Sequence, residues 1–234
     1  MDLFFNASYV AFLKNFAAKA DIRYYLQGIY FEKFHYKRPG YDALLEGAIG
    51  LATDGHQLAA IIDTYGWVRQ PTLISLDAGA TAQCRAKSRT GFGHLPKVVI
   101  VRGQRLSIEY QSAPCKDVVE TINPNALEAY IQPGECLIEG VFPAWRRVLP
   151  DIAALEPGAP DCYAGALIQK AVMAARVLDD SKRYNGVRLW RVKGESHKPI
   201  VLQYDSHPNA LTLVMPMRGD TDGQGTPKLW NYLK

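Results

Sequence analysis

Apolar positions along the chain follow first a helical and then a strand-like spacing, and this order of patterns returns further on. The segment after Asn6 has the period of a helix, and Asn6 or Ser8 are residue types that cap helix N-termini. At 100° per residue, the apolar face of this helix contains Tyr9, Val10, Leu13, Phe16, Ala17 and Ala20. Ala11 falls on the opposite, polar face. We expect strands next, over 23–34 and 48–63, on either side of a Pro39-Gly40 loop.

The same order of helix and strands appears twice more. In the second stretch we expect a strand over 71–77, a short, weak helix over 78–89, a hairpin around Gly103 and a further strand over 135–143. In the third stretch the pattern predicts a strong helix within 161–183, and then strands over 186–193, 199–205 and 210–216.

The repetition has two interpretations. In the first, the chain holds three copies of one unit, a helix followed by about three antiparallel strands, and the helices cover one face of the sheets. In the second, it is an α+β domain whose elements recur by chance. Both give the α+β class, and only the first predicts that each unit needs a neighbour to bury its apolar face.

The segment 209–218 raises a question about binding. Leu211, Leu213 and Val214 read as a strand, and Pro216 must end it because proline has no N–H to donate. Met215 and Met217 flank that proline. Methionine is flexible and polarizable, so the pair suits either an adaptable binding surface or the filling of a core.

Composition narrows the possible classes of protein. The chain of 234 residues is 48% hydrophobic and 21% charged, as is usual for a globular protein. It has no apolar run of membrane-spanning length and lacks the order of a signal peptide, so no membrane partner is expected. The four cysteines are far apart, which favours a reducing cytoplasm, and the scattered histidines predict no metal site and no cofactor.

The net charge of +4 is mild, but its distribution is uneven. The first two predicted helices carry basic residues and no acidic one, and the third has acidic residues only after it ends, at Asp179 and Asp180. The basic residues are Lys14 and Lys19 in the first, Arg85, Lys87 and Arg89 in the second, and Lys170 and Arg176 in the third. This indicates either solvated helix faces or a surface that attracts phosphate without reading sequence.

Four segments then identify a resemblance. They are "RYYLQGIYFE" (23–32), "LATDGHQLA" (51–59), "FPAWRRVLP" (142–150) and "VMPMR" (214–218). In type, order and rough spacing they resemble the bacterial DNA polymerase III beta subunit, the sliding clamp. "YNGVRLW" (184–190) is similar to the opening strand of that family's last domain.

The resemblance implies a DNA-clamp fold and a role without catalysis. Clamps of this family close into a ring around double-stranded DNA, with helices lining the hole and sheets outside, and bind it independently of sequence. They hold a DNA polymerase and the clamp loader through short peptide motifs. By this analogy, the chain would form a homo-oligomeric ring and act as a processivity factor in DNA replication.

Residue by residue, the resemblance also implies a peptide pocket and a DNA-facing set. The pocket comprises Leu26, Thr53, Gly55, His56, Gln57, Leu58, Pro143, Arg147, Val148, Leu213, Val214, Met215, Pro216, Met217 and Arg218. The DNA-facing set is Lys14, Lys19, Arg23, Arg85, Lys87, Arg89, Lys170 and Arg176. His56 has a plainer interpretation as a turn residue, and Arg147 as half of a structural ion pair.

The departures from the family are large. Residues 1–148 resemble its second domain, 149–218 a shortened last domain, and 219–234 form an extra tail, while its first domain has no counterpart here. Gln57 stands where the family usually has arginine. A truncation of this kind is more typical of a phage or mobile-element protein than of a host clamp.

Two other functions and the subunit number remain open at this stage. A non-ring decoy that takes clamp-binding peptides from host proteins would keep the pocket without a basic inner surface. An enzyme could be imagined around His56 and Asp54, or around Cys84, but the sequence contains no full catalytic set. The family's ring has twelve helix-plus-strands units, so three units per chain predict four chains, ahead of a trimer or a dimer.

Overall fold

The computed structural model describes residues 1–37, 44–85, 97–110, 128–157, 165–178, 186–195 and 198–216. Within these ranges the helices are α1 (Ala7–Lys14), α2 (Ala78–Arg85) and α3 (Gly165–Leu178), with short 3₁₀ turns at η1 (Tyr24–Gln27), η3 (Trp145–Val148) and η4 (Ile152–Ala154). Lys87, Arg89, Met217, Arg218 and the tail, for which the sequence predicted roles, lie outside the described residues.

The described strands form two antiparallel sheets. One has the order β5-β1-β7-β8-β9, with β1 (Leu3–Asn6), β5 (Trp67–Val68), β7 (Lys97–Arg102), β8 (Arg105–Tyr110) and β9 (Glu128–Ile131). The other has eight strands in the order β10-β11-β12-β13-β4-β3-β2-β6. Its members are β2 (Ile29–Lys37), β3 (Leu44–Thr53), β4 (Gln57–Asp63), β6 (Thr72–Ile74), β10 (Leu155–Pro157), β11 (Val187–Val192), β12 (Ile200–Tyr204) and β13 (His207–Val214).

The described part of the chain contains three units of the same order, strand, helix and three strands. The first unit is β1-α1-β2-β3-β4, the second is β6-α2-β7-β8-β9 and the third is β10-α3-β11-β12-β13. This confirms the fold class predicted from the sequence. It also gives each unit an opening strand, of which β6 corresponds to the strand expected over 71–77. The predicted boundary between residues 148 and 149 stays a prediction, because one sheet contains strands from both sides of it.

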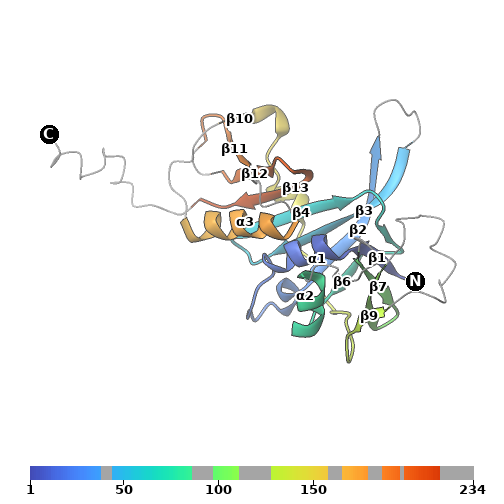
Figure 1. The fold of residues 1–234 in the computed structure, drawn as a ribbon. Coiled ribbons are helices and arrows are strands. Elements are labelled where there is room, and N and C mark those ends of the chain that lie inside the picture. Colours follow the sequence, from blue (N-terminus) through green and yellow to red (C-terminus); the bar gives the residue numbers. More distant parts are fainter. Residues whose placement is uncertain are drawn as a thin grey trace.

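The helices lie together on one side of the sheets, with α1 packed against both α2 and α3 (Figure 1). The main core fills the space between them and the sheets. This core connects different units, as Phe12 of α1 shows. The centroid of its ring lies 5.2 Å from that of Phe16 and 5.4 Å from that of Tyr204 of β12, which it contacts edge-on. Burial of such large apolar side chains is the main stabilising contribution to this fold.

A second apolar cluster covers the opposite, outer face of the eight-stranded sheet. Alternate residues of its strands contribute to this cluster, among them Leu51, Leu58 and Leu213. The chain between β9 and β10 covers them with Phe142 and Trp145, both buried. Because this sheet is apolar on both faces, the outer face needs that irregular segment to keep it from water.

Several expected boundaries are corrected. The first helix ends at Lys14, where the Asn15 side chain donates to the carbonyls of Ala11 and Phe12. Ala11, predicted on a polar face, is fully buried because helices flank α1 on both sides. The segment 48–63 is two strands rather than one, and 135–143 forms only an isolated bridge between Ile74 and Leu137.

No helix in the described ranges is both long enough and apolar enough to cross a membrane.

Candidate functional site

The junction of the first and third units is a strand pair. β4 and β13 run antiparallel from Ala210 opposite Ile61 to Val214 opposite Gln57. Within this pairing Leu58 and Leu213 are direct neighbours on the outer face. Past the end of β13, the backbone N–H of Met215 donates to the carbonyl of His56 at 3.1 Å. The chain thereby brings together two of the four segments that resemble the clamp family.

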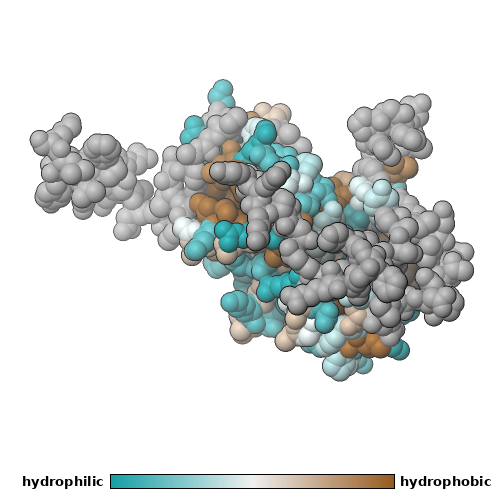
Figure 2. Space-filling model, in the orientation of Figure 1, coloured by the Kyte–Doolittle hydropathy of each residue, from teal (hydrophilic) through white to brown (hydrophobic). Residues whose placement is uncertain are grey.

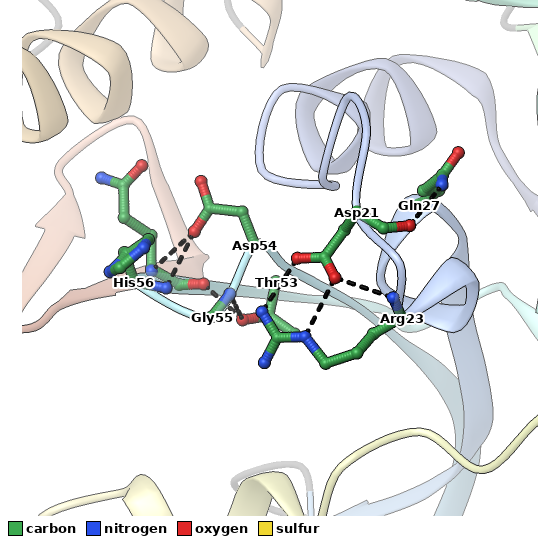
Figure 3. A network of polar contacts seen from close by, with 8 residues as sticks. Asp21, Arg23, Gln27, Thr53, Asp54, Gly55 and His56 are labelled. Carbon is green, nitrogen blue, oxygen red and sulfur yellow. Dashed lines mark hydrogen bonds and ion pairs between the residues drawn. The ribbon is translucent and has the colours of Figure 1, made fainter.

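The turn between β3 and β4 is fixed by its own side chains (Figure 3). The Asp54 carboxylate accepts the backbone N–H groups of His56 at 3.0 Å and Gln57 at 2.9 Å. Thr53 Oγ1 donates to the carbonyl of Gln57 at 2.6 Å and accepts from the N–H of Gly55. Gly55 has φ +88°, a region that favours glycine, so the sequence Asp-Gly selects this tight turn.

Arg23 lies against the same turn. Its guanidinium forms a bidentate ion pair with the Asp21 carboxylate, in which Nε and Nη2 lie 3.0 Å and 2.8 Å from the two carboxylate oxygens. A Cβ atom added to Gly55 would come within 3.2 Å of Arg23 Nη2, so glycine leaves room for this contact. The hydrogen bonds from Arg23 lower the pKa of Asp21 to about 2. Figure 3 shows the pair beside the turn.

On its other side the turn is tied to α3. Lys170 Nζ lies 2.7 Å from the Asp54 carboxylate, and Gln57 Nε2 donates to the carbonyl of Leu167 at 2.7 Å. Burial by itself would raise the pKa of Asp54, but the Lys170 ammonium and the two backbone donors outweigh it and hold that pKa below its usual value. The turn therefore links the outer face of the sheet to the helix layer.

The loop 141–149 forms the second part of the site, next to the turn between β3 and β4. The Phe142 ring stacks on Tyr30 at 4.8 Å with the planes only 4° apart. The Arg146 guanidinium lies 4.3 Å from the Trp145 ring and also pairs with Glu32, which accepts the Tyr30 hydroxyl at 3.0 Å. These contacts anchor the loop to β2 and leave Val148, 44% exposed, facing solvent.

The predicted pocket residues divide into two groups by exposure. Exposed or half-buried are Gly55, His56, Pro143, Arg147, Val148, Met215 and Pro216. Buried are Leu26, Thr53, Gln57, Leu58, Leu213 and Val214.

Three of the buried side chains cannot form an accessible wall as expected. Leu26 is 2% exposed, Gln57 points to α3, and Val214 belongs to the core on the helix side of the sheet. Leu58 and Leu213 lie on the outer face of the sheet, but in the buried cluster that Phe142 and Trp145 cover. The surface that a ligand can reach in this conformation is therefore narrower than the family comparison implied.

The sequence patterns did not reveal the aromatic and charged side chains that hold the loop. Phe142, Trp145, Arg146, Tyr30 and Glu32 all stand inside the quoted segments, yet none was singled out. A signal was present, because an arginine next to a tryptophan commonly stacks on it. The ion pair proposed for Arg147 is formed by its neighbour Arg146, and Arg147 is exposed.

Several of the cations expected to face DNA have partners within the chain. Lys14 Nζ is 3.3 Å from the carbonyl of Gln27, and burial lowers the pKa of its ammonium. Lys170 pairs with Asp54, Arg23 with Asp21, and Arg85 Nη2 donates to Asn15 Oδ1 at 2.9 Å. Lys19 and Arg176 are exposed.

The groups that could have supported an enzyme are not arranged for catalysis. Asp54 accepts the backbone N–H of His56 and pairs with Lys170, so it is engaged in holding the turn. Burial raises the pKa of the Cys84 thiol to about 12, which leaves almost no thiolate at neutral pH. Among the residues that the structure describes, no cluster of His, Cys, Asp and Glu could hold a metal ion.

The arrangement of three repeated units with one helix layer matches solved structures of bacterial sliding clamps. The Bartonella birtlesii clamp aligns with a TM-score of 0.52 at 14% identity, covering 93% of this chain and 66% of that one. The chain has the sliding-clamp fold. The DNA polymerase III beta subunit of Thermotoga maritima aligns with a TM-score of 0.51 at 12% identity, covering 94% of this chain and 66% of that one. The C. crescentus clamp aligns with a TM-score of 0.50 at 16% identity, covering 93% of this chain and 65% of that one.

The likeness to these clamps is a likeness of fold. The chain spans about two-thirds of the length of these clamps. No family model matches the sequence, and no curated protein matches it either. At this level of identity the likeness establishes the fold, and the function must be argued from the site.

Proposed function

We propose that this chain is a sliding clamp, a protein without catalytic activity that tethers replication proteins to duplex DNA through their short apolar peptide segments. The observation that carries the proposal is convergence. Four segments that are far apart in sequence meet around the β4–β13 junction. They are 23–32, 51–59, 142–150 and the end of β13. This convergence supports a shared binding surface.

The chemistry of that surface suits a short peptide with aliphatic and aromatic side chains. Val148 and Met215 are 44% and 40% exposed beside buried apolar clusters, and methionine adapts to different ligand shapes. The loop and the turn on either side are held by the contacts described above, so little order would have to be created on binding. A DNA polymerase and a clamp loader are the partners that we propose.

Peptide binding can be tested by fluorescence polarisation with a labelled Gln-Leu-x-Leu-Phe peptide. If Val148 and Met215 are hot spots, replacing both with alanine should weaken binding by roughly 2 kcal/mol, about 30-fold. Ile131→Ala is a matched control, because Ile131 is similarly exposed at 39% but lies in the other sheet. Equal affinities for the double variant and the wild type would contradict the site.

For DNA we propose that the helix layer faces the duplex in a homo-oligomeric ring in the cytoplasm. The exposed cations Lys19 and Arg176 would carry most of the attraction, since Lys14 and Lys170 are engaged within the chain. Binding should be sequence-independent and weaken steeply with salt. Lys19→Gln with Arg176→Gln should reduce retention on closed circular duplex more than Lys14→Gln with Lys170→Gln does, although both pairs remove two charges.

The same internal pairing of cations favours a second candidate, a decoy that binds clamp-binding peptides without encircling DNA. Lys170 and Arg23 pair with the carboxylates of Asp54 and Asp21, which lowers the net charge available to phosphate. Lys14 and Arg85 donate to neutral oxygens of this chain and keep their charge. A decoy would bind the peptide with full affinity and show no retention on duplex DNA, even at low salt. A phage origin is compatible with either candidate.

A further inference from the structure

The peptide site described above lacks an open place for an aromatic side chain. Val148 and Met215 form its exposed rim, whereas Leu58 and Leu213 of the sheet beneath are 6% and 2% exposed. On the face of the molecule drawn in Figure 2, the described hydrophobic residues form only small areas between hydrophilic ones. An aromatic ring needs a concave apolar site to lose its contact with water. In this conformation the apolar part of the site is therefore closed.

Two aromatic side chains close it, and they are held differently. Phe142 and Trp145 cover the buried cluster that contains Leu58 and Leu213. The Phe142 ring stacks on Tyr30 with the centroids 4.8 Å apart, and it has no polar atom. Trp145 is 9% exposed, and its indole Nε1 is buried without a hydrogen-bond partner among the described residues. A buried donor that lacks an acceptor costs free energy, because water would accept its hydrogen bond.

The unpartnered N–H favours conformers in which the indole leaves the cluster. Burial of the apolar ring favours the closed conformer. Outside the cluster, however, water can accept the N–H, which is why buried tryptophans usually have a partner for this group. The two contributions oppose each other for Trp145, whereas Phe142 has only the first. Of the two covering side chains, Trp145 is therefore the easier one to move.

The backbone of the loop can stay in place while the indole moves. The N–H of Trp145 donates to the carbonyl of Pro143 at 2.7 Å, and the N–H of Arg147 donates to the carbonyl of Ala144 at 3.0 Å. The ion pair of Arg146 ties the same turn to β2. None of these contacts involves the indole, so rotation about the side-chain bonds of Trp145 leaves them intact. The exposed Arg146 guanidinium, 4.3 Å from the ring centroid, can follow the ring.

We propose that Trp145 is a lid: its indole occupies a subsite lined by Leu58 and Leu213, and the aromatic side chain of a bound peptide displaces it. This role of Trp145 rests on the proposed function, because it assigns the subsite to one residue of the same ligand. The occupant is argued from the molecule itself, since the subsite already holds an aromatic ring of this chain. A phenylalanine ring fills such a space without leaving a donor unpaired. The rim of Val148 and Met215 then binds the rest of the peptide.

Peptide affinities of two variants of Trp145 test the lid, with fluorescence polarisation of the labelled Gln-Leu-x-Leu-Phe peptide. With the lid closed in about 90% of wild-type molecules, Trp145→Ala should tighten binding about tenfold, because the subsite is then always open. Trp145→Phe should show no gain, because its ring still fills the subsite and has no N–H that favours opening. Circular dichroism establishes that both variants keep the wild-type fold. Weaker binding by a folded Trp145→Ala variant would make Trp145 a wall that the ligand contacts and would overturn the lid.

Tryptophan fluorescence follows the indole directly in a chain whose lid is unchanged. The sequence has four tryptophans, so Trp67→Phe, Trp190→Phe and Trp230→Phe leave Trp145 as the only one. Saturating peptide should shift its emission to longer wavelength and increase its quenching by acrylamide, because the indole moves from the cluster into water. The peptide Gln-Leu-x-Leu-Ala, which lacks the aromatic ring, should leave the emission unchanged.

A chain that keeps Trp190 as its only tryptophan is the matched control. Trp190 packs partly buried against the same cluster but lies on β11, so its emission should change with neither peptide. Unchanged emission of Trp145 at saturating Gln-Leu-x-Leu-Phe would overturn the lid and leave the peptide site in place. Absence of peptide binding by both the wild type and the Trp145→Ala variant would instead remove the proposed function.

Discussion

The contact between Asp54 and Lys170 allows a sharp test of how the turn is held. Asp54 makes three interactions, an ion pair with Lys170 at 2.7 Å and hydrogen bonds from the backbone of His56 and Gln57. Asp54→Asn keeps an oxygen that can accept the two N–H groups but removes the charge. Asp54→Ala removes all three interactions.

The expected magnitudes follow from these contacts. A partly exposed ion pair contributes about 1 kcal/mol or less. Each hydrogen bond from the backbone contributes about 1 kcal/mol. Asp54→Asn should therefore lower the free energy of unfolding by about 1 kcal/mol and Asp54→Ala by about 3 kcal/mol. A double-mutant cycle with Lys170→Met should assign about 1 kcal/mol to the coupling of Asp54 with Lys170.

Urea unfolding followed by circular dichroism measures these differences, and pH gives a further check. The pKa of Asp54 is lower in the folded protein than its ordinary value of 3.8, so ionisation of this carboxyl favours folding above that value. The contribution is lost as the pH falls through the folded pKa. The effect of Asp54→Asn should thus be full at pH 7 and shrink below about pH 4. Equal effects of the asparagine and alanine variants, with no coupling to Lys170, would refute this account of the turn.

Two more variants examine the core and the thiols. Leu213→Ala should lower the free energy of unfolding by about 2–5 kcal/mol in the same urea assay. Leu213 is 2% exposed, and the smaller side chain would leave a cavity at the β4–β13 junction. A decrease of less than about 1 kcal/mol would contradict that packing. Cys84 and Cys136 should react with a thiol reagent only on unfolding at pH 8, since burial raises their pKa values to about 12 and about 11; fast labelling of Cys84 in the native protein, identified by peptide mapping, would be the opposite result.

Local signals explain why so much of the fold was predictable. The Asn6 side chain accepts the N–H of Ser8 at the start of α1, as its residue type indicated. Gly103, with φ +57°, turns the chain between β7 and β8. Pro216 follows the end of β13, as a residue without an N–H must. In each case one residue determines the local structure.

Long-range pairing explains what the sequence could not give. The exchange of β1 and β6 between units depends on which edges are free, and no local pattern encodes that. β9 was missed, and 135–143 was assigned as a strand although it covers the outer face in irregular form. The same limit applies to the site, because Gln57 sits on a strand whose alternation alone does not tell which face the helices cover.

Cations were the hardest residues to interpret from the sequence. Lys170 lies on the predicted helix away from its apolar stripe, which indicated an exposed, DNA-facing position. Its partner Asp54 is 116 residues away in the chain, so only the tertiary structure shows that the charge is compensated. The number of basic residues on a predicted helix face is therefore an upper limit on the positive charge that the face presents to a ligand.

Hydrogen–deuterium exchange of the full chain, with and without the Gln-Leu-x-Leu-Phe peptide, tests the central claim most directly. The account predicts slower exchange on binding at the amides of residues 55–58 and 145–149, on the two sides of the β4–β13 junction. The hairpin of β7 and β8 in the other sheet should exchange at an unchanged rate. Saturating peptide that protects neither segment, or protects only residues outside them, would contradict a peptide site at this junction.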